Sequence, residues 1–196
     1  MWEERFAASP DYVFGKEPSH FLTAHRAWFK PGLTALSVAD GEGRNSVYMA
    51  QQGMSVTALE FAPSALARAR ALAAERGVQV DYREVDVLAV QTFEGSYDLV
   101  AGLLIQFVGP DERRKLFAKM KDATKPGGLV MLHGYTPEQV ALGTGGPPYI
   151  ANMYTEEILR DEFDGWNIIE IAEYHRAAQS GKGTAAYIDF IARKPG

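Results

Sequence analysis

The stretch Leu36–Phe61 reads LSVADGEGRNSVYMAQQGMSVTALEF and decides which fold we expect for the chain. An apolar run over 33–39 predicts a buried strand, and a polar turn with two glycines follows it at 40–45. After a helical segment, a second apolar run at 54–59 predicts another strand, which stops at Glu60. The stretch therefore contains a strand, a glycine turn, a helix and a second strand that ends in an acidic residue. This order is the local arrangement of a nucleotide-type site.

The residue types in this arrangement suit a nucleoside ligand. The backbones of Gly41 and Gly43 allow N–H groups to come close to a ligand, and the Glu60 carboxylate can accept hydrogen bonds from both hydroxyls of a ribose. The third glycine of the dinucleotide fingerprint GxGxxG is missing, which speaks against an NAD-dependent oxidoreductase. No GKS or GKT follows the turn, so a phosphate-cradling loop of the ATPase type is excluded.

The segment GEGRN at 41–45, followed by a strand that ends in Glu60, resembles the S-adenosylmethionine (SAM) site of class I methyltransferases. Within that family the chain is most similar to the small bacterial branch that groups the tellurite-resistance and thiopurine methyltransferases. Further segments carry this similarity over nearly the whole chain: WEERF at 2–6, DYVFGKEPSHFL at 11–22, PGG at 126–128, and YTPEQ and GTGGPP within 135–148. The resemblance implies SAM as the cofactor and S-adenosylhomocysteine (SAH) as its product.

The resemblance also implies which residues hold the cofactor. They lie in the glycine turn, at the ends of the second and third strands, and at the end of the fourth: Asp40, Gly41, Glu42, Gly43, Arg44, Asn45, Glu60, Phe61, Asp86, Val87 and Leu103. Many members of the family carry an acidic residue and a glycine where this chain has Ser37 and Ala39, so Asp40 is our choice for the methionine amino group. Asp86 would accept from the adenine amino group; alternatively, it caps a loop.

Three residues are candidates for the catalytic step. Gln106 follows the predicted fourth strand where many relatives carry a histidine, and because glutamine cannot act as a base it indicates polar positioning. His133 could take a proton from an acceptor near pH 7, or could be a hydrogen-bonded, half-buried residue. Tyr12 lies in an aromatic amino-terminal arm. Its ring could face the cation of SAM, the arm could cover part of the core, and both interpretations can hold together. No metal ligands are predicted, because the other histidines are scattered.

The rest of the chain predicts strands that alternate with helices. Strands are expected over 78–85, 97–105, 129–132, 166–174 and 184–192, and helices over 19–29, 63–77, 110–124 and 155–163. A hairpin at 179–183 would join the last two strands, whereas 1–17 and the Gly- and Pro-rich segment 136–148 are expected to be irregular. This order indicates an α/β, Rossmann-like fold: a seven-stranded, mostly parallel sheet with a C-terminal antiparallel hairpin and helices on both faces.

Length and composition bound the remaining possibilities. A chain of 196 residues fits one domain over 1–196, with 1–32 as an aromatic lid and helix and 33–196 as the sheet core. The net charge of −5 argues against a nucleic-acid partner, and the lack of cysteine excludes disulfides and thiolate metal sites. No signal-peptide core is present, and no apolar run approaches the roughly 20 residues that span a bilayer. We therefore expect a cytoplasmic bacterial protein, monomeric or homodimeric, without a membrane partner.

These observations lead to one expected function and one alternative. The expected function is transfer of a methyl group from SAM to a small-molecule acceptor, which could be a thiol, a metalloid oxyanion or an amine. The transfer is an in-line displacement that depends mainly on positioning, so only some acceptors require a base. The alternative is a SAM-binding protein without catalysis that acts as a sensor or as a partner of another protein.

Overall fold

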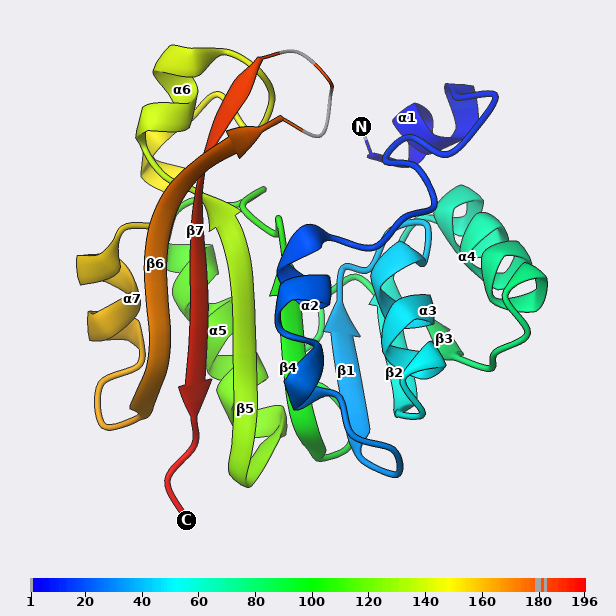
Figure 1. The fold of residues 1–196 in the computed structure, drawn as a ribbon, viewed down its shortest axis with the longest axis horizontal. Helices are drawn as coiled ribbons and strands as arrows, with labels where there is room; N and C mark the ends of the chain where they lie inside the picture. Colours follow the sequence, from blue (N-terminus) through cyan, green and yellow to red (C-terminus); the bar gives the residue numbers. More distant parts are fainter. Residues whose placement is uncertain (1, 179–180, 182) are drawn as a thin grey trace. The chain divides into compact units, whose positions relative to one another are not determined.

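A computed structural model describes residues 2–178, 181 and 183–196 of the chain. The chain clusters into two compact units: Met1–Val90 with Tyr97–Ala101, and Gln91–Ser96 with Gly102–Gly196. The strands form a seven-stranded sheet in the order β3-β2-β1-β4-β5-β7-β6 (Figure 1). A parallel part and an antiparallel end confirm the predicted α/β, Rossmann-like class. That 1–196 is one domain stays a prediction.

The first unit contains the parallel strands and the amino-terminal helices. Its elements are α1 (Trp2–Ala8), α2 (His20–Ala24), η1 (Arg26–Trp28), β1 (Thr34–Val38), α3 (Arg44–Gln51), β2 (Ser55–Glu60), α4 (Pro63–Glu75), β3 (Asp81–Glu84) and the start of β4 (Tyr97–Leu103). β1 pairs in parallel with β2 and β4, and β2 pairs in parallel with β3. The carboxyl ends of these strands therefore lie at one edge, where open α/β sheets bind ligands.

Small side chains let α4 pack closely within this unit. Ala65, Ala69 and Ala73 recur at the four-residue spacing of one helix face, and all three are buried. Pro63 stands in the first turn, where a helix needs no N–H from it. Gly77, with φ of +68°, follows the helix in the left-handed conformation that ends many helices. The helix predicted over 63–77 is therefore confirmed.

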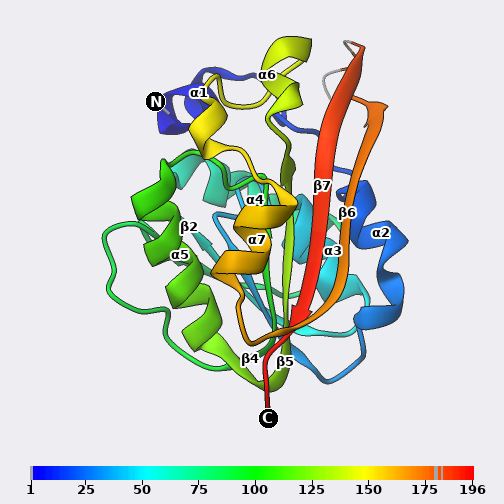
Figure 2. The same ribbon diagram turned by 90° about the vertical axis from the view of Figure 1, so that its left-hand side faces the viewer.

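The second unit contains the antiparallel end of the sheet. Its elements are α5 (Pro110–Ala123), β5 (Thr124–Tyr135), α6 (Glu138–Leu142), η2 (Ile150–Asn152), α7 (Glu156–Glu162), β6 (Asn167–Ala177) and β7 (Thr184–Arg193). β7 pairs antiparallel with β5 and with β6, and is buried along most of its length. Figure 2 shows α5 and α7 beside these strands. The ring of Phe163 joins them: it packs 5.6 Å from Phe117 of α5 and 4.8 Å from Phe190 of β7.

The first unit differs from the predicted boundaries at three places. Helix α1 forms where the sequence predicts irregular backbone, because Phe6 finds a buried position against α4. The helix predicted over 19–29 is two short pieces, α2 and η1, since the backbone leaves α-helical geometry at His25 (φ −102°, ψ 23°). β3 covers only the later part of the predicted strand 78–85.

The second unit also differs from its predicted boundaries. β5 begins at Thr124 rather than at residue 129, because Gly127 and Gly128 exchange backbone hydrogen bonds with Lys194. Helix α6 lies within the segment 136–148, which the sequence predicts to be irregular, and a left-handed glycine follows it. The predicted hairpin includes residues 179, 180 and 182, which lie outside the described residues.

Candidate active site

The turn after β1 is built from left-handed backbone. Ala39, Gly41 and Gly43 have φ of +51°, +65° and +89°. Such φ values are ordinary for glycine and cost about 1–3 kcal/mol for a residue with a side chain. At Gly43 a Cβ would lie 2.8 Å from Cα of Ala69 and 2.9 Å from Oη of Tyr82. Glycine is therefore required at position 43 both by the backbone and by the close approach of α4.

Asp40 lies within this turn, and its side chain is buried. Its Oδ1 accepts from Ser37 Oγ at 2.6 Å and from the Ser46 N–H at 3.3 Å, and its Oδ2 accepts from Ser46 Oγ. Burial raises the pKa of Asp40, and the serine hydrogen bonds offset part of this effect. Both carboxylate oxygens are engaged inside the protein, so in the structure Asp40 holds the turn. Its contact with a methionine amino group stays a prediction.

Glu60 ends β2 with its carboxylate on the glycine turn. Oε2 accepts from the Gly41 N–H at 2.8 Å, and Oε1 accepts from the N–H groups of Phe61 (2.9 Å) and Ala62 (3.0 Å). Only 4% of the residue is exposed. A carboxylate has about four acceptor positions, so three backbone bonds leave capacity for a ligand hydroxyl. Glu60 and Gly41 thus form one fixed unit at the carboxyl ends of β1 and β2.

The residues that follow β2 and β3 add exposed groups to this edge. Asp86 is exposed, and its Oδ1 accepts from the Leu88 N–H at 2.9 Å, so the predicted loop-capping alternative is present. One such bond leaves other acceptor positions of the carboxylate open to a ligand. Phe61 and Leu88 are exposed by 44% and 38%, whereas Val87 is buried. A site lined by a carboxylate and by apolar side chains can bind an aromatic base that carries an amino group.

Glu42 holds the amino-terminal arm, which we define as residues 9–19. Its Oε2 accepts from the N–H groups of Val13 (2.7 Å) and Phe14 (3.3 Å), and its Oε1 lies 2.7 Å from Nη1 of Arg68. The Glu42 side chain is buried and most of the Arg68 side chain is covered, which strengthens this charged pair. The glycine turn and the arm are therefore fixed to each other.

Arg44 and Asn45 act on the same arm. Oδ1 of Asn45 accepts from the Ser19 N–H at 3.0 Å, just before α2. Nη1 of Arg44 donates to the Phe14 carbonyl at 3.4 Å, and the guanidinium lies 5.9 Å from the centre of the Phe14 ring. Together with Glu42, these residues contact the arm in the structure, and a direct contact with a cofactor stays a prediction for all three.

Tyr12 packs on the helices of the first unit. Its hydroxyl donates to the Arg68 carbonyl at 3.0 Å, and its ring packs against Val47 and Leu72. A cation does lie over the ring, but it is the Lys16 ammonium, 5.1 Å from the ring centre. The structure shows the arm as a cover for the core, and contact of the Tyr12 ring with the cation of SAM stays a prediction.

In the second unit, Gln106 fastens the end of β5. Its Oε1 accepts from the Tyr135 N–H at 2.6 Å, and its Nε2 donates to the Tyr135 carbonyl at 2.8 Å. Nδ2 of Asn152, in η2, donates to the Gln106 carbonyl at 3.1 Å. Because Gln106 is buried and its amide is engaged, it positions β5 and η2. Contact between Gln106 and a methyl acceptor stays a prediction.

Replacing Gln106 with leucine is expected to lower the free energy of unfolding by about 1–3 kcal/mol, because it removes the side-chain amide that accepts from the Tyr135 N–H at 2.6 Å, whereas the Tyr135 carbonyl still accepts from the Tyr154 N–H at 3.0 Å. Urea unfolding followed by circular dichroism measures the change. Gln51→Leu, at an exposed position of α3, is the matched control and should change stability by less than about 0.5 kcal/mol. Equal effects of the two substitutions would contradict the fastening role.

His133 lies in the core of the second unit and has no exposed surface. Its Nδ1 lies 2.6 Å from Oδ1 of Asp189, which also accepts from the Tyr174 hydroxyl at 3.1 Å. Its ring stacks on Tyr187 at 4.9 Å. Burial, followed by the neighbouring Asp189, raises the pKa of Tyr174. A base must reach the proton that it removes, so this geometry favours the hydrogen-bonded core interpretation, and catalysis by His133 stays a prediction.

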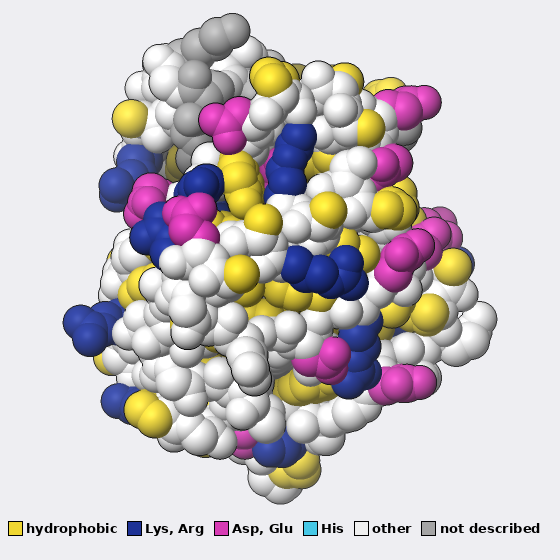
Figure 3. All heavy atoms as spheres, turned by 90° about the vertical axis from the view of Figure 1, so that its right-hand side faces the viewer, with side chains coloured by type: hydrophobic (Ala, Val, Ile, Leu, Met, Phe, Trp, Pro, Cys, Tyr) yellow, Lys and Arg dark blue, Asp and Glu magenta, His cyan; other side chains and the backbone are white. Residues whose placement is uncertain are grey.

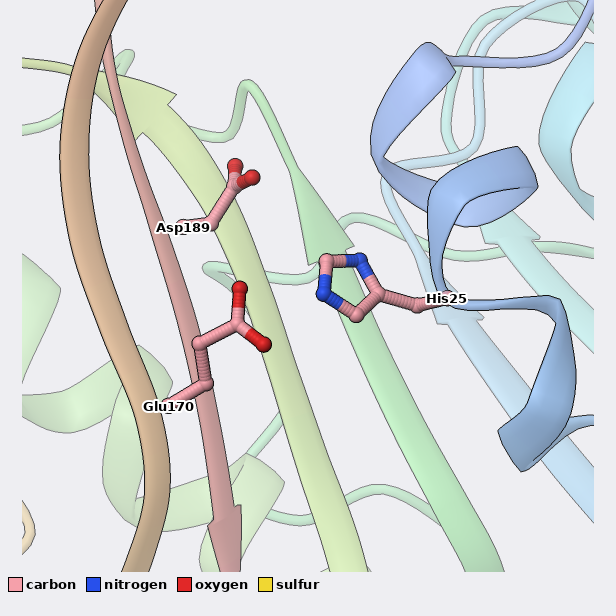
Figure 4. Close-up of side chains that lie close together, drawn as sticks. All are labelled: His25, Glu170 and Asp189. Carbon is pink, nitrogen blue, oxygen red and sulfur yellow. The ribbon is translucent and has the colours of Figure 1, made fainter.

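Two further groups of side chains include residues of the second unit. Figure 4 shows the carboxylates of Asp189 and Glu170 on the same side of β7 and β6. His25, which is also labelled there, belongs to the first unit, and we assign no metal site to the three. Leu103, half-buried at the end of β4, falls in the second unit, whereas the other predicted cofactor residues lie in the first.

Residues 35–128 match the family model described as a methyltransferase domain. The matched span contains most of β1, the glycine turn and Glu60, from which the site above is built. Over this span the chain belongs to the methyltransferase-domain family. The predicted family is therefore confirmed.

Curated relatives of this methyltransferase domain include two proteins from Xanthomonas. The ubiquinone biosynthesis O-methyltransferase of Xanthomonas campestris pv. campestris (strain B100) is 35% identical over 147 residues, which cover 69% of this chain and 61% of that protein. The protein of the same name from Xanthomonas euvesicatoria pv. vesicatoria (strain 85-10) is 37% identical over 126 residues, covering 62% and 52%. The chain thus spans 52–61% of the length of these relatives.

Solved structures share the fold of this methyltransferase domain. The N-methyltransferase NodS from Bradyrhizobium japonicum WM9, in complex with SAH, superposes with a TM-score of 0.74 at 13% identity, covering 99% of this chain and 97% of NodS. TehB from Haemophilus influenzae gives a TM-score of 0.74 at 17% identity, covering 98% and 67%. At these identities the likeness concerns the fold, and it confirms the predicted Rossmann-like methyltransferase architecture.

Sequence reasoning missed the residues that join the arm and α1 to this methyltransferase domain. The helical spacing of Arg68 predicts a solvated face, yet its guanidinium contacts Glu42 and the Ser9 carbonyl. Glu3 and Phe6 both contact the start of α4. No local pattern could reveal these contacts, because each partner lies on an element far away in the chain.

Proposed function

We propose that this chain transfers a methyl group from SAM to a small-molecule acceptor. One observation carries the proposal: the Glu60 carboxylate, at the end of β2, is fixed to the Gly41 N–H of the glycine turn at the carboxyl ends of parallel strands. The residues present fit the cofactor, because glycine backbone lies beside a carboxylate that keeps acceptor capacity.

The proposal divides the predicted cofactor residues other than Leu103 into two groups. Glu60 accepts from the ribose, Gly41 lets the backbone approach the cofactor, Asp86 accepts from the adenine amino group, and Phe61 and Val87 flank the base. The second group shapes the turn and the arm in the structure, and its contact with the cofactor stays a prediction: Asp40, Glu42, Gly43, Arg44 and Asn45. This division follows the hydrogen bonds of each side chain in the structure.

Bound SAM supplies a methyl group that its sulfonium makes electrophilic. The chain's own residues orient the cofactor and keep water from it, and alignment of donor and acceptor can contribute about 7–11 kcal/mol in favourable cases. An acceptor that is already an anion needs no base. The burial of His133 is therefore compatible with methyl transfer to such an acceptor.

The environment of Glu60 gives a pH dependence for cofactor binding. Burial raises the pKa of Glu60 above the ordinary value of 4.5, and backbone hydrogen bonds from Ala62, Gly41 and Phe61 oppose this shift. The ionised carboxylate binds the ribose, so affinity is present above the raised pKa and is lost as the pH falls through it. Calorimetric titration with SAH is expected to show a midpoint above pH 4.5 that disappears in Glu60→Gln. The same midpoint in both proteins would contradict the ribose assignment.

The acceptor class can be narrowed by experiment. The relatives named O-methyltransferases favour an oxygen acceptor, to be tested beside thiols, amines and metalloid oxyanions. Incubation with methyl-labelled SAM and one representative of each class is expected to yield a labelled product with at least one of them. Binding of SAH without transfer to any class would remove the proposed activity.

Binding of SAH without methyl transfer to any acceptor would support the second candidate, a SAM-binding protein without catalysis. The internal engagement of Gln106 and His133, which leaves neither side chain exposed, favours this candidate. A catalyst converts SAM to SAH when its acceptor is added, whereas a sensor keeps its ligand unchanged. Chromatography of the bound nucleoside before and after addition of acceptors separates the two.

We further propose that the protein acts in the cytoplasm as a monomer or homodimer, without a nucleic-acid partner. The net charge of −5, and the interspersed positive and negative groups on the face drawn in Figure 3, do not suit a polyanion. In the part of the chain that the structure describes, no helix combines the length and apolar character needed to cross a bilayer. Light scattering and cell fractionation test the oligomeric state and the location.

A further inference from the structure

We propose that helix α1 is a lid on the SAM site, fastened by hydrogen bonds between Glu3 and Ser64, and that the cofactor leaves only when this fastening opens. The inference rests on the proposed function and adds how access to the same site is controlled. It is built from contacts within the first unit, between α1, the glycine turn and the start of α4.

Phe6 places α1 on the backbone that orients Glu60. Its Cζ lies 3.8 Å from the position that a Cβ on Gly41 would occupy. The ring is buried and packs with Ala62 and Ala65, both of which it helps to cover completely. The N–H groups of Gly41 and Ala62 are two of the three that bind the Glu60 carboxylate. A ligand that reaches Glu60 through the glycine turn therefore passes next to Phe6.

Glu3 fastens α1 to the amino-terminal end of α4. Its Oε2 accepts from the Ser64 N–H at 3.1 Å, and its Oε1 accepts from the Ser64 hydroxyl. The N-cap residue of α4 is Ala62, which has no side chain that could cap the helix. Glu3 thus supplies the cap from another part of the chain, and the positive end of the helix dipole favours its carboxylate.

A more exposed layer of contacts lies over this fastening. The Trp2 ring lies 5.8 Å from the ring of Phe6 and 6.0 Å from that of Phe14. The Arg5 guanidinium lies 5.0 Å from the centre of the Trp2 ring and 5.2 Å from that of Phe14. Cation–π contacts are weak where water competes for the cation. Glu3 and Phe6 therefore carry most of the attachment of α1.

The arm behind α1 is held more firmly than α1 itself. Buried Glu42 accepts from two N–H groups of the arm, and Arg68 donates to the Ser9 carbonyl. Helix α1 has seven residues, too few for a helix that persists on its own in water. When Glu3 releases Ser64, α1 should lose both its position and its helical structure while the arm from Ser9 onward stays in place.

The test measures the release of SAH in a protein that also reports on α1. The chain has three tryptophans; in the background Trp28→Phe with Trp166→Phe, emission from Trp2 follows the attachment of the helix. Stopped-flow displacement of SAH by excess SAM gives the release rate. We expect Glu3→Ala to speed release about tenfold, as loss of charge-assisted hydrogen bonds would, and Ser64→Ala to speed it less, since the backbone N–H remains.

The matched control is Glu156→Gln, which removes a surface carboxylate that pairs with Arg160 on α7 at 2.7 Å. Its release rate should equal that of the parent protein. Unchanged release in Glu3→Ala and Ser64→Ala, with Trp2 emission showing α1 detached, would overturn the lid. Unchanged Trp2 emission in Glu3→Ala would overturn the fastening. Failure of the parent protein to bind SAH would instead remove the proposed function, so the two failures are distinct.

Discussion

Replacing Gly43 with alanine is expected to lower the free energy of unfolding by about 3 kcal/mol or more and to weaken SAH binding. The added Cβ would stand 2.8 Å from Cα of Ala69, a backbone atom that moves only if α4 moves. The left-handed φ of +89° adds strain for any residue with a side chain. Because the turn carries Gly41 and its bond to Glu60, a shift of α4 reaches the cofactor site directly.

Urea unfolding and calorimetric titration with SAH measure the two effects. Gly77→Ala is the matched control: its φ of +68° is also left-handed, but a Cβ there meets no atom within 4 Å. The control should therefore lose only about 1 kcal/mol from backbone strain and keep its affinity for SAH. If both variants lost the same stability, the close approach of α4 to the turn would have no energetic role.

Replacing Glu60 with alanine is expected to weaken binding of SAM and SAH by about 1–3 kcal/mol, roughly 5- to 150-fold in the dissociation constant. The substitution removes the acceptor proposed for the ribose. It also leaves the N–H groups of Gly41, Phe61 and Ala62 without their present partner, so the turn loses its fixed geometry. Glu60→Gln keeps one acceptor oxygen and should give an intermediate loss.

Calorimetry with SAH measures this change, and thermal unfolding shows whether each variant is folded at the temperature used. Glu75→Gln is the control, because it removes a carboxylate from the exposed end of α4, where Glu75 pairs with Lys16 at 2.6 Å. Exposed pairs of this kind contribute little, so its affinity should match that of the parent protein. A folded Glu60→Ala protein with unchanged affinity would end the assignment of Glu60 to the ribose.

The strand–turn–helix–strand unit could be predicted because its signals are local. Apolar runs mark β1 and β2, and the turn between β1 and α3 needs glycine whatever the rest of the chain does. The acidic end of β2 is also visible in the sequence, and Glu60 is found at that strand end with its carboxylate on Gly41. Periodicity and backbone conformation depend on residues that are neighbours in the chain, and a sequence shows those neighbours directly.

The partners of the polar turn residues could not be predicted in the same way. Glu42, Arg44 and Asn45 are residue types that suit either a charged ligand or a neighbouring backbone, and the choice depends on what lies opposite them. In the structure the arm lies opposite these residues. Glu42 accepts from the N–H of Val13, which is 29 residues away, and Asn45 accepts from the N–H of Ser19, which is 26 residues away. Such distant pairing leaves no periodic signal in the sequence.

The sequence alone determined the α/β class and the positions of the glycine turn and the acidic strand end, because each follows from short-range backbone and burial preferences. The family is predicted from the resemblance of GEGRN and the strand that ends in Glu60 to a known site. Only the tertiary structure decided that Asp40 is enclosed by serines, that His133 is buried against Asp189, and that Glu3 caps α4. These outcomes depend on which surfaces meet when separate elements pack. A carboxylate can bind a ligand, a helix end or a serine equally well, and its neighbours in space select among them.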